Sequence, residues 1–468
     1  MTSQKTGTDK VVREGNSYRM ERIKRISQSF FLHIHSTRVH ISSLRPTYTF
    51  GLGIILGFLF LILILTGVVL MMYYTPSVER AYDSVKDIVY IVPGGRYIRN
   101  IHRWASHGMV LIVFLHLARV FYTGSYMHSR KLNWIIGVCM LVITLFLSFS
   151  GYLLPWDQLA YWAVTIGSNI AASARELTDL LGITNYIDIG GFMKKLLIGE
   201  ETVGQPALSR FFTLHVIFLP LSLLVLIAVH FWRIRKDGGL SCADFREGVN
   251  RESDEEKNKI YTWPVVMWAE LAILFVISAV LLLTAFIVDA PLLEKANPAF
   301  PENPAKSPWY FLGIQELVSY SAFSGGLLIP LLYLGFLISI PYIDKQDHYQ
   351  GRWFAGKTGM RTALYSLVMS LVVVIGQLFV MVRYGWLRDW FPGISQGVVM
   401  LVNPATLSVI GFVLWAGWIR RKTNSTRMAS IALFTASLVA IVIFTAMGIW
   451  FRGPNWDFFW SRSQWPVI

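Results

Sequence analysis

The hydrophobic positions of this chain fall into nine long apolar runs that are separated by polar loops. The runs cover about residues 48–74, 102–122, 134–154, 211–232, 264–288, 322–343, 361–383, 396–419 and 428–450. A helix of about 20 apolar residues spans a hydrocarbon core of about 30 Å. The pattern therefore predicts an all-α polytopic membrane protein, with a bundle of four transmembrane helices followed by about five more.

Polar stretches divide the chain into five regions. Residues 1–45 hold a polar tail and, from Tyr18 to about His40, alternating basic and apolar residues that predict an amphipathic helix on the membrane surface. Residues 46–236 contain the first four spans. The charged linker 237–260 is the clearest boundary, and it separates them from segments 261–390 and 391–468, the latter holding the last two spans.

Composition and charge support a membrane location. Of the 468 residues, 54% are hydrophobic and 15% are charged, which would leave a soluble protein with too much exposed apolar surface. The net charge of +14 is concentrated in short loops and in the N-terminal tail rather than in a nucleic-acid-binding region. The positive-inside rule then predicts a cytoplasmic N-terminus.

The two cysteines, Cys139 and Cys242, are too few for a disulfide framework, a CxxCH haem-attachment motif or a cysteine-ligated iron–sulfur cluster. The N-terminus also lacks the apolar core of a cleavable signal peptide.

Two pairs of histidines lie inside apolar runs. His116 follows His102 by 14 residues, and His230 follows His215 by 15, so each pair lies close to one helix face with levels about 21–22 Å apart. Two such helices side by side offer two axial His/His sites, which suits haem iron. The alternative is that each is a buried histidine bonded to a backbone carbonyl. That alternative fits one intramembrane histidine better than four in matched pairs.

Glycines repeat the same interval in two other spans. Gly67 follows Gly53 by 14 residues, and Gly151 follows Gly137 by 14. Glycine lets a bulky planar group approach the helix backbone, so these positions predict clearance for a porphyrin. Small-residue helix packing is the alternative explanation.

Several strings resemble a known family, the cytochrome b of quinol-oxidising bc and b6f complexes. They are HRWASHGMVLIVFLHLAR from His102, GYLLPWDQLAYW from Gly151, LSRFFTLH and HFWRIRK. The likeness covers roughly residues 20–240 and is nearest to the b6 type. Residues 261–390 resemble, more weakly, the C-terminal half of the family (subunit IV), and the last two spans lie outside it.

The resemblance implies two non-covalent b-type haems, bound by His102 with His215 near the outer face and by His116 with His230 near the inner face. It also places Arg99, Arg119 and Arg210 beside haem propionates, although arginines at a membrane edge also snorkel to water. His107 and His128 match no ligand position and are interpreted as structural. Phe50 stands where the b6 type has a cysteine, so no covalent c-type haem is expected.

The outer quinol site of the family carries Pro-Glu-Trp-Tyr, and the aligned residues here are Ser307, Pro308, Trp309 and Tyr310. The carboxylate is missing, although quinol oxidation needs a nearby base. Glu316 is the first candidate for that role, with Glu302 and Asp289 as weaker ones. At the inner quinone site the resemblance points to Arg235, for which a plain positive-inside role is the alternative.

The resemblance therefore predicts a quinol:cytochrome c oxidoreductase subunit in a bacterial inner membrane. A lipid quinol, with menaquinol as one candidate, would give electrons to a Rieske iron–sulfur protein and a c-type cytochrome, and through the two haems to a quinone, coupled to proton translocation. A homodimeric complex and no nucleic-acid partner are expected.

Two other functions remain open at this point: a haem b anchor that links quinone to a dehydrogenase or hydrogenase, and a proton-coupled transporter with histidine relays. The tryptophans and arginines after residue 449 suggest an interfacial aromatic belt and a docking surface for a cytochrome.

Overall fold

The computed structural model describes residues 38–237, 239, 258–345 and 351–466. The predicted surface helix and most of the charged linker lie outside the described residues. In the described part, eight helices are long and apolar enough to cross a membrane, and a bent pair makes a ninth. This confirms the all-α membrane fold that the hydrophobic pattern predicts.

The first four spans form a bundle. They are α3 (Leu52–Met71), α5 (Gly95–Tyr122), α6 (Lys131–Tyr152) and α11 (Leu219–Lys236), the last continuing α10 (Gln205–Thr213) through a π-helical turn, η4 (Leu214–Phe218). α3 packs on α5, and α11 packs on α6. The bundle therefore carries one histidine-bearing helix in each packed pair.

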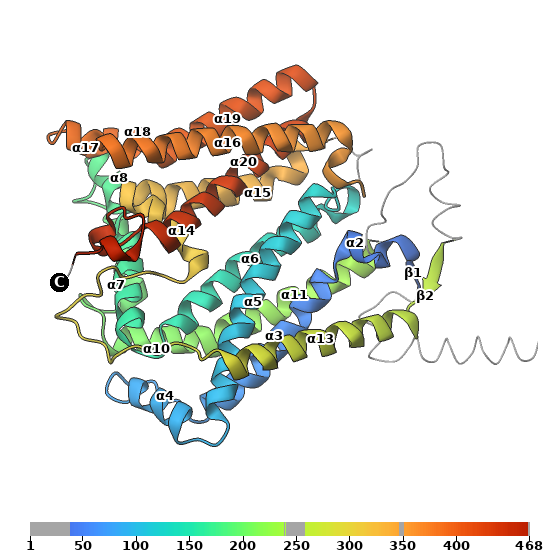
Figure 1. Cartoon of the computed structure of the whole chain (residues 1–468), viewed down its shortest axis with the longest axis horizontal. Coiled ribbons are helices and arrows are strands. Elements are labelled where there is room, and N and C mark those ends of the chain that lie inside the picture. The colour runs from blue at the N-terminus through green and yellow to red at the C-terminus, as the bar shows by residue number, and fades with distance from the viewer. Residues whose placement is uncertain (1–37, 238, 240–257, 346–350, 467–468) are drawn as a thin grey trace, which may run out of the picture.

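The later spans lie against this bundle. α13 (Val265–Ile287) packs on α5 and α3, and α15 (Ile329–Ile343), which continues η5 (Ser324–Leu328), packs on α6. α16 (Lys357–Tyr384), α19 (Pro404–Thr423) and α20 (Thr426–Ala446) pack on one another in a separate layer (Figure 1). α20 continues through a π-helical turn, η8 (Met447–Phe451).

The eighth span is broken, whereas the hydrophobic pattern predicts one run over 396–419. α18 (Gln396–Val402) and α19 meet at Asn403 with a bend of 43°. Pro404 disfavours helical geometry at the residue before it, and the Asn403 side chain caps α19 by accepting from the Thr406 amide at 3.0 Å. Hydropathy alone does not reveal such a break.

Short elements gather at the two ends of the bundle (Figure 1). The end nearer His102, here called the His102 end, carries α4 (Ala81–Tyr90), α7 (Gln158–Ala172), α8 (Arg175–Leu180), α9 (Ile189–Ile198), α14 (Trp309–Tyr320), α17 (Leu387–Trp390), η9 (Pro454–Trp456) and η10 (Arg462–Gln464). The opposite, His116 end carries η2 (Ile41–Leu44), α2 (Pro46–Thr49), η3 (His128–Arg130), η7 (Trp353–Ala355) and an antiparallel pair of strands, β1 (Arg38–His40) and β2 (Lys259–Tyr261). The strand pair was not predicted from the sequence.

The largest buried cluster joins the two halves of the chain. Phe121, Tyr126 and Trp134 of the first bundle pack with Leu337 of α15 and Ile431 of α20. Because helices from both halves contribute to one core, the later spans hold a fixed position relative to the histidine-bearing helices.

Candidate functional site

His102 of α5 and His215 of η4 face each other across the bundle. Their ring centroids are 6.3 Å apart, and the rings are inclined by 76°. A bond between a metal and an imidazole nitrogen is about 2 Å long, so two imidazoles on opposite sides of one iron have ring centres about 6 Å apart. The spacing of this pair fits axial ligation of a single iron.

Hydrogen bonds to the Nδ1 atoms orient both rings. His102 Nδ1 lies 2.9 Å from Thr66 Oγ1, and His215 Nδ1 lies 3.1 Å from the Leu147 carbonyl oxygen and 3.2 Å from Ser150 Oγ. Metal-binding histidines commonly fix the ring in this way through the nitrogen that does not bind the metal. These contacts therefore leave Nε2 as the ligand atom of each ring.

The histidines form pairs and not larger clusters. In the part of the chain that the structure describes, no three His, Cys, Asp or Glu side chains gather as a metal site. A bare zinc or calcium ion needs more protein ligands than a pair supplies. Two opposed imidazoles instead suit an iron whose remaining ligands come from a macrocycle, so the residues present fit haem.

His116 and His230 form the second level, four helical turns along α5 and α11. They lie close enough to interact electrostatically. Unlike either ring of the first pair, the His116 ring has a buried Nδ1 without a hydrogen-bond partner among the described residues. The two levels therefore differ in how firmly the protein orients the imidazoles.

The π-helical turn explains how unequal spacings produce matched pairs. In a regular α-helix, 15 residues rotate a side chain by about 100° more than 14 residues do. η4, which begins at Leu214 and contains His215, absorbs one extra residue at the start of the histidine pair. The 15-residue spacing on α11 thereby presents its histidines to those of α5.

Three of the four singled-out glycines lie directly against histidine rings. A Cβ at Gly151 would lie 2.4 Å from His215 Cε1, and a Cβ at Gly67 or Gly53 would lie 3.2 or 3.5 Å from the Cε1 of His102 or His116. A Cβ at Gly137 would meet nothing within 4 Å. The first three therefore clear the imidazoles themselves, whereas the sequence interpretation assigned all four to porphyrin clearance.

The predicted propionate arginines divide into two kinds. Arg99 donates to the carbonyls of Ala290 and Pro291 at 2.8 and 2.7 Å, and Arg210 donates to those of Lys195 and Leu196 at 2.8 and 2.5 Å. These two guanidinium groups hold loops at the His102 end.

Arg119 is different, because it keeps an unsatisfied donor. Its Nε donates to the Tyr48 carbonyl at 2.9 Å, while its Nη2 is buried without a partner among the described residues. Arg103 likewise has a buried Nε that finds no partner in the described part of the chain, and its guanidinium lies 5.0 Å from the Tyr152 ring centre. Arg103 was not among the predicted site residues, although it directly follows His102. Both arginines can donate to an acidic group such as a propionate.

The PWDQ string anchors the loop that leads to Ser307. Asp157 caps α7 and accepts from the Leu293 amide at 3.1 Å. Gln158 donates to the Phe300 carbonyl at 2.9 Å and accepts from the Asn297 amide at 2.8 Å. These side chains therefore fix residues 293–300, in the loop that leads to the predicted outer quinol site.

His107 lies at this site as well. Trp309 Nε1 donates to His107 Nδ1 at 3.1 Å, and the His107 and Tyr310 ring centres are 5.6 Å apart. Its Nε2 is buried without a partner among the described residues. His107 was interpreted as structural because it matches no ligand position. No local signal placed it beside Trp309, which is 202 residues away in sequence.

The candidate proton acceptors are already engaged. Glu316 is fully buried and accepts from Arg452, Trp456 and Tyr320. Asp289 accepts from Arg96 at 2.6 and 2.5 Å, and hydrogen bonds from Arg96 and Asn100 hold the pKa of its carboxyl below the usual value. These contacts argue against either as the proton acceptor, because the carboxylate oxygens of both already accept hydrogen bonds from neighbouring side chains. Glu302, the remaining candidate, is half-buried.

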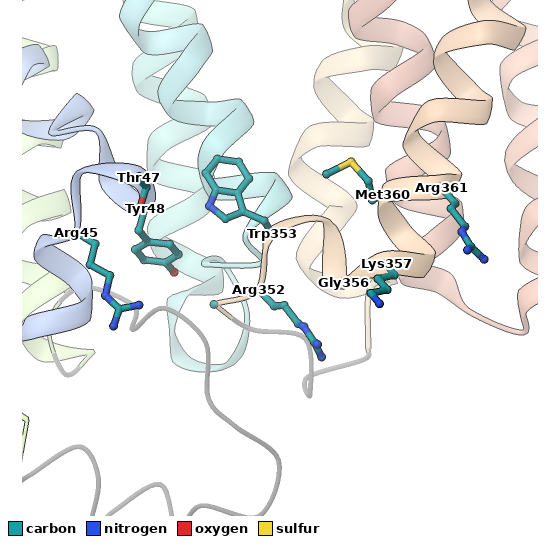
Figure 2. Close-up of a pocket in the computed structure, with 10 residues that line it drawn as sticks. Arg45, Thr47, Tyr48, Arg352, Trp353, Gly356, Lys357, Met360 and Arg361 are labelled. Carbon is teal, nitrogen blue, oxygen red and sulfur yellow. The ribbon is translucent and has the colours of Figure 1, made fainter.

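A cavity of about 670 Å³ opens at the His116 end. The aromatic side chains of Tyr48 and Trp353 line it, together with the cationic side chains of Arg45, Arg352, Lys357 and Arg361. Figure 2 shows the guanidinium groups of Arg45 and Arg352 both extending toward the lower part of the view. Tyr48 also lies under the Arg119 guanidinium, 4.3 Å from ring centre to Cζ. Arg235, predicted at the inner quinone site, is not among the lining residues.

The fold and the histidine pairs define a class: a polytopic helical membrane protein with axial ligand sites for haem. A family model described as cytochrome b/b6/petB matches residues 38–238. The cytochrome b6 of Prochlorococcus marinus strain AS9601 is 44% identical over 179 residues, which are 38% of this chain and 77% of that protein. That of strain MIT 9211 is 43% identical over 179 residues, again 38% of this chain and 77% of that protein. The chain belongs to the cytochrome b/b6 family, and this membership implies b-type haem.

A solved structure extends the likeness to the later spans. A chain of a hyperthermophilic respiratory Complex III superposes with a TM-score of 0.60 at 22% identity, covering 91% of this chain and 97% of that chain. At this identity the match shows a shared fold. It extends well beyond the segment that matches the family model.

Proposed function

We propose that the chain is the di-haem cytochrome b subunit of a quinol:cytochrome c oxidoreductase of the bc type. The observation that carries the proposal is the His102–His215 pair, whose spacing and Nδ1 contacts suit one axially ligated iron. His116 and His230 would hold a second haem at the other level. Bound b haems would act as one-electron carriers, and their reduction potentials would depend on the histidine ligands and on the hydrogen bonds of those ligands.

The residues of the chain then have separable tasks. Thr66 and Ser150 orient the imidazoles at the first level, while Arg103 and Arg119, each with a buried donor that has no partner among the described residues, would hold propionates. Gly53, Gly67 and Gly151 let the backbones of α3 and α6 lie close to the histidine rings. None of these roles requires a covalent haem, and Phe50 in place of cysteine supports non-covalent binding.

The outer quinol site would lie at the His102 end, at the start of α14. Trp309 and Tyr310 would contact the quinol ring. His107 accepts from Trp309 at Nδ1, so the neutral imidazole carries its proton on the buried Nε2, which can donate to a quinol oxygen. Oxidation of one quinol to quinone would release two protons to water at this end and two electrons. One electron would pass to a Rieske iron–sulfur partner, and the other would enter the chain at the haem that His102 and His215 would hold.

The cationic cavity supports the proposed orientation. Arg45, Arg352, Lys357 and Arg361 lie at the His116 end, which the positive-inside rule assigns to the cytoplasm. Quinone reduction would take place at this end, with Arg235 as the predicted contact, and protons would be released at the other. A c-type cytochrome, a homodimeric complex and a bacterial inner membrane complete the proposal.

The first test is a pyridine haemochrome assay with a redox-titrated visible spectrum of the purified complex. We expect two acid–acetone-extractable b haems of separate potential, both reduced when quinol is added. His102→Ala should remove one of them, and His128→Ala, the matched control, should retain both. A preparation without haem, or with covalent haem, would contradict the proposal.

A further inference from the structure

Glu316 lies on α14, the helix that begins at Trp309. Its carboxylate is held by residues 447–466, here called the C-terminal segment. Arg452 Nη2 donates to Oε1 at 2.5 Å and its Nε donates to Oε2 at 2.9 Å, while Trp456 Nε1 donates to Oε2 at 2.9 Å. Tyr320 Oη, on α14 itself, donates to Oε1 at 2.6 Å. A fully buried carboxylate is stable only when it is paired and hydrogen-bonded in this way.

The same C-terminal segment also holds the loop in front of α14. Lys306 Nζ donates to the Ile449 carbonyl at 3.1 Å. Asn303 and Asn455 form two hydrogen bonds. Asn303 Nδ2 donates to Asn455 Oδ1 at 2.8 Å, and the backbone amide of Asn455 donates to Asn303 Oδ1 at 2.6 Å. The loop that carries Ser307 is therefore attached to the C-terminal segment at two points before Ser307, Asn303 and Lys306.

Close backbone packing completes the contact. A Cβ at Gly313 of α14 would lie 3.0 Å from Thr445 Oγ1, and a Cβ at Gly448 of η8 would lie 3.0 Å from Leu312 Cβ. The π-helical turn η8 ends one residue before Arg452, and such turns often mark functional positions. α14 has little freedom to move relative to the C-terminal segment.

We propose that Arg452 is a positioning residue for the outer quinol site. By holding Glu316, it fixes the register of α14 and thereby the placement of Trp309 and Tyr310 at its start. Arg452 lies far outside residues 38–238, the segment that matches the family model. The ion pair between Arg452 and Glu316 is therefore formed by the part of the chain that follows this segment. The inference rests on the proposed function, because it assumes that quinol is oxidised at this loop.

The test compares variants of the purified complex by the rate of quinol-dependent haem reduction per haem at saturating quinol. Arg452→Gln should lower this rate by up to about 100-fold, because a displacement of about 1 Å at a reacting site has effects of that size. Arg452→Lys keeps the positive charge but not the bidentate hydrogen bonding to Glu316, so its rate should lie between those of the wild type and Arg452→Gln. Trp456→Phe removes one donor and preserves packing, and it should give a smaller loss.

Two controls separate positioning from general damage. Arg462→Gln alters an exposed arginine of the same segment, whose guanidinium lies 5.8 Å from the Trp465 ring centre, and its rate should equal the wild-type rate. In every variant, haem content and the oxidation of reduced haem by added quinone at the inner site should stay unchanged.

Wild-type rates per haem in both Arg452→Gln and Trp456→Phe would overturn the inference, as would a parallel loss at the inner site. A wild-type complex without quinol-dependent haem reduction would instead overturn the proposed function, and this inference with it.

Discussion

Replacing Gly151 by alanine should remove one haem selectively, because the new methyl group would collide with a ligand imidazole. The Cβ would lie 2.4 Å from His215 Cε1, 2.9 Å from Nε2 and 3.0 Å from Nδ1. Carbon contacts are favourable at about 3.5–4.0 Å, so the ring would have to move by about 1 Å. Metal–ligand distances tolerate changes of about 0.2 Å. The ring also cannot rotate away without losing its contacts to Leu147 and Ser150.

The glycines provide a graded series for the assay, which is the haem-to-protein ratio from pyridine haemochrome spectra. Gly67→Ala places the Cβ 3.2 Å from His102 Cε1 and should weaken haem binding less than Gly151→Ala does. Gly53→Ala, at 3.5 Å from His116 Cε1, should be nearly neutral. Gly57→Ala is the matched control on the same helix, since its Cβ would meet nothing within 4 Å.

Gly137 distinguishes the two explanations for the glycines. Its Cβ would enter open space, so Gly137→Ala should be harmless if glycines clear only imidazoles. It should remove the inner haem if the macrocycle fills that space. Full haem content in Gly151→Ala would refute the reasoning at its first step, because a separation of 2.4 Å leaves no room for both the methyl group and the imidazole.

Two further changes test the orientation of the ligands and the attachment of the last helix. Thr66→Val removes the hydrogen bond to His102 Nδ1 and should weaken haem binding by about 10- to 100-fold, measured by haem retention during dilution or by a shift of the midpoint potential. Arg427→Met breaks the buried ion pair between Arg427 and Asp344 and should cost about 3–5 kcal/mol, seen as a lower unfolding temperature of the complex. The exposed Arg420→Met serves as its control, and equal unfolding temperatures for the two variants would contradict the prediction.

The sequence predicts the features that depend on short, regular intervals. Nine apolar runs give the spans because a helix must be about 20 residues long to cross the hydrocarbon. The interval between His102 and His116 places both on one face of one helix. Such local periodicities are independent of how distant segments pack, and the structure retains them.

Features that depend on distant partners were not predictable in this way. The carboxylate of Glu316 is the first candidate base in the sequence, but its partner Arg452 lies 136 residues further on. His107 meets Trp309 only because the chain returns to α5 at the start of α14. The π-helical turn at His215 reconciles the unequal histidine intervals, and a one-residue irregularity of this kind has no signature in hydropathy.

The two buried arginines near the ends of the last span explain why it has one register. Arg427 donates to the Phe121 carbonyl and Tyr126 hydroxyl at 2.7 Å each and pairs with Asp344 at 3.4 Å, at the His116 end. Arg452 pairs with Glu316 at the His102 end. A helix that slipped by one residue would break two buried ion pairs, one at each end. Because breaking a buried ion pair is strongly destabilising, the span is held at both ends by charge as well as by packing. Hydropathy cannot specify that register, because a window shifted by one residue has almost the same mean hydropathy.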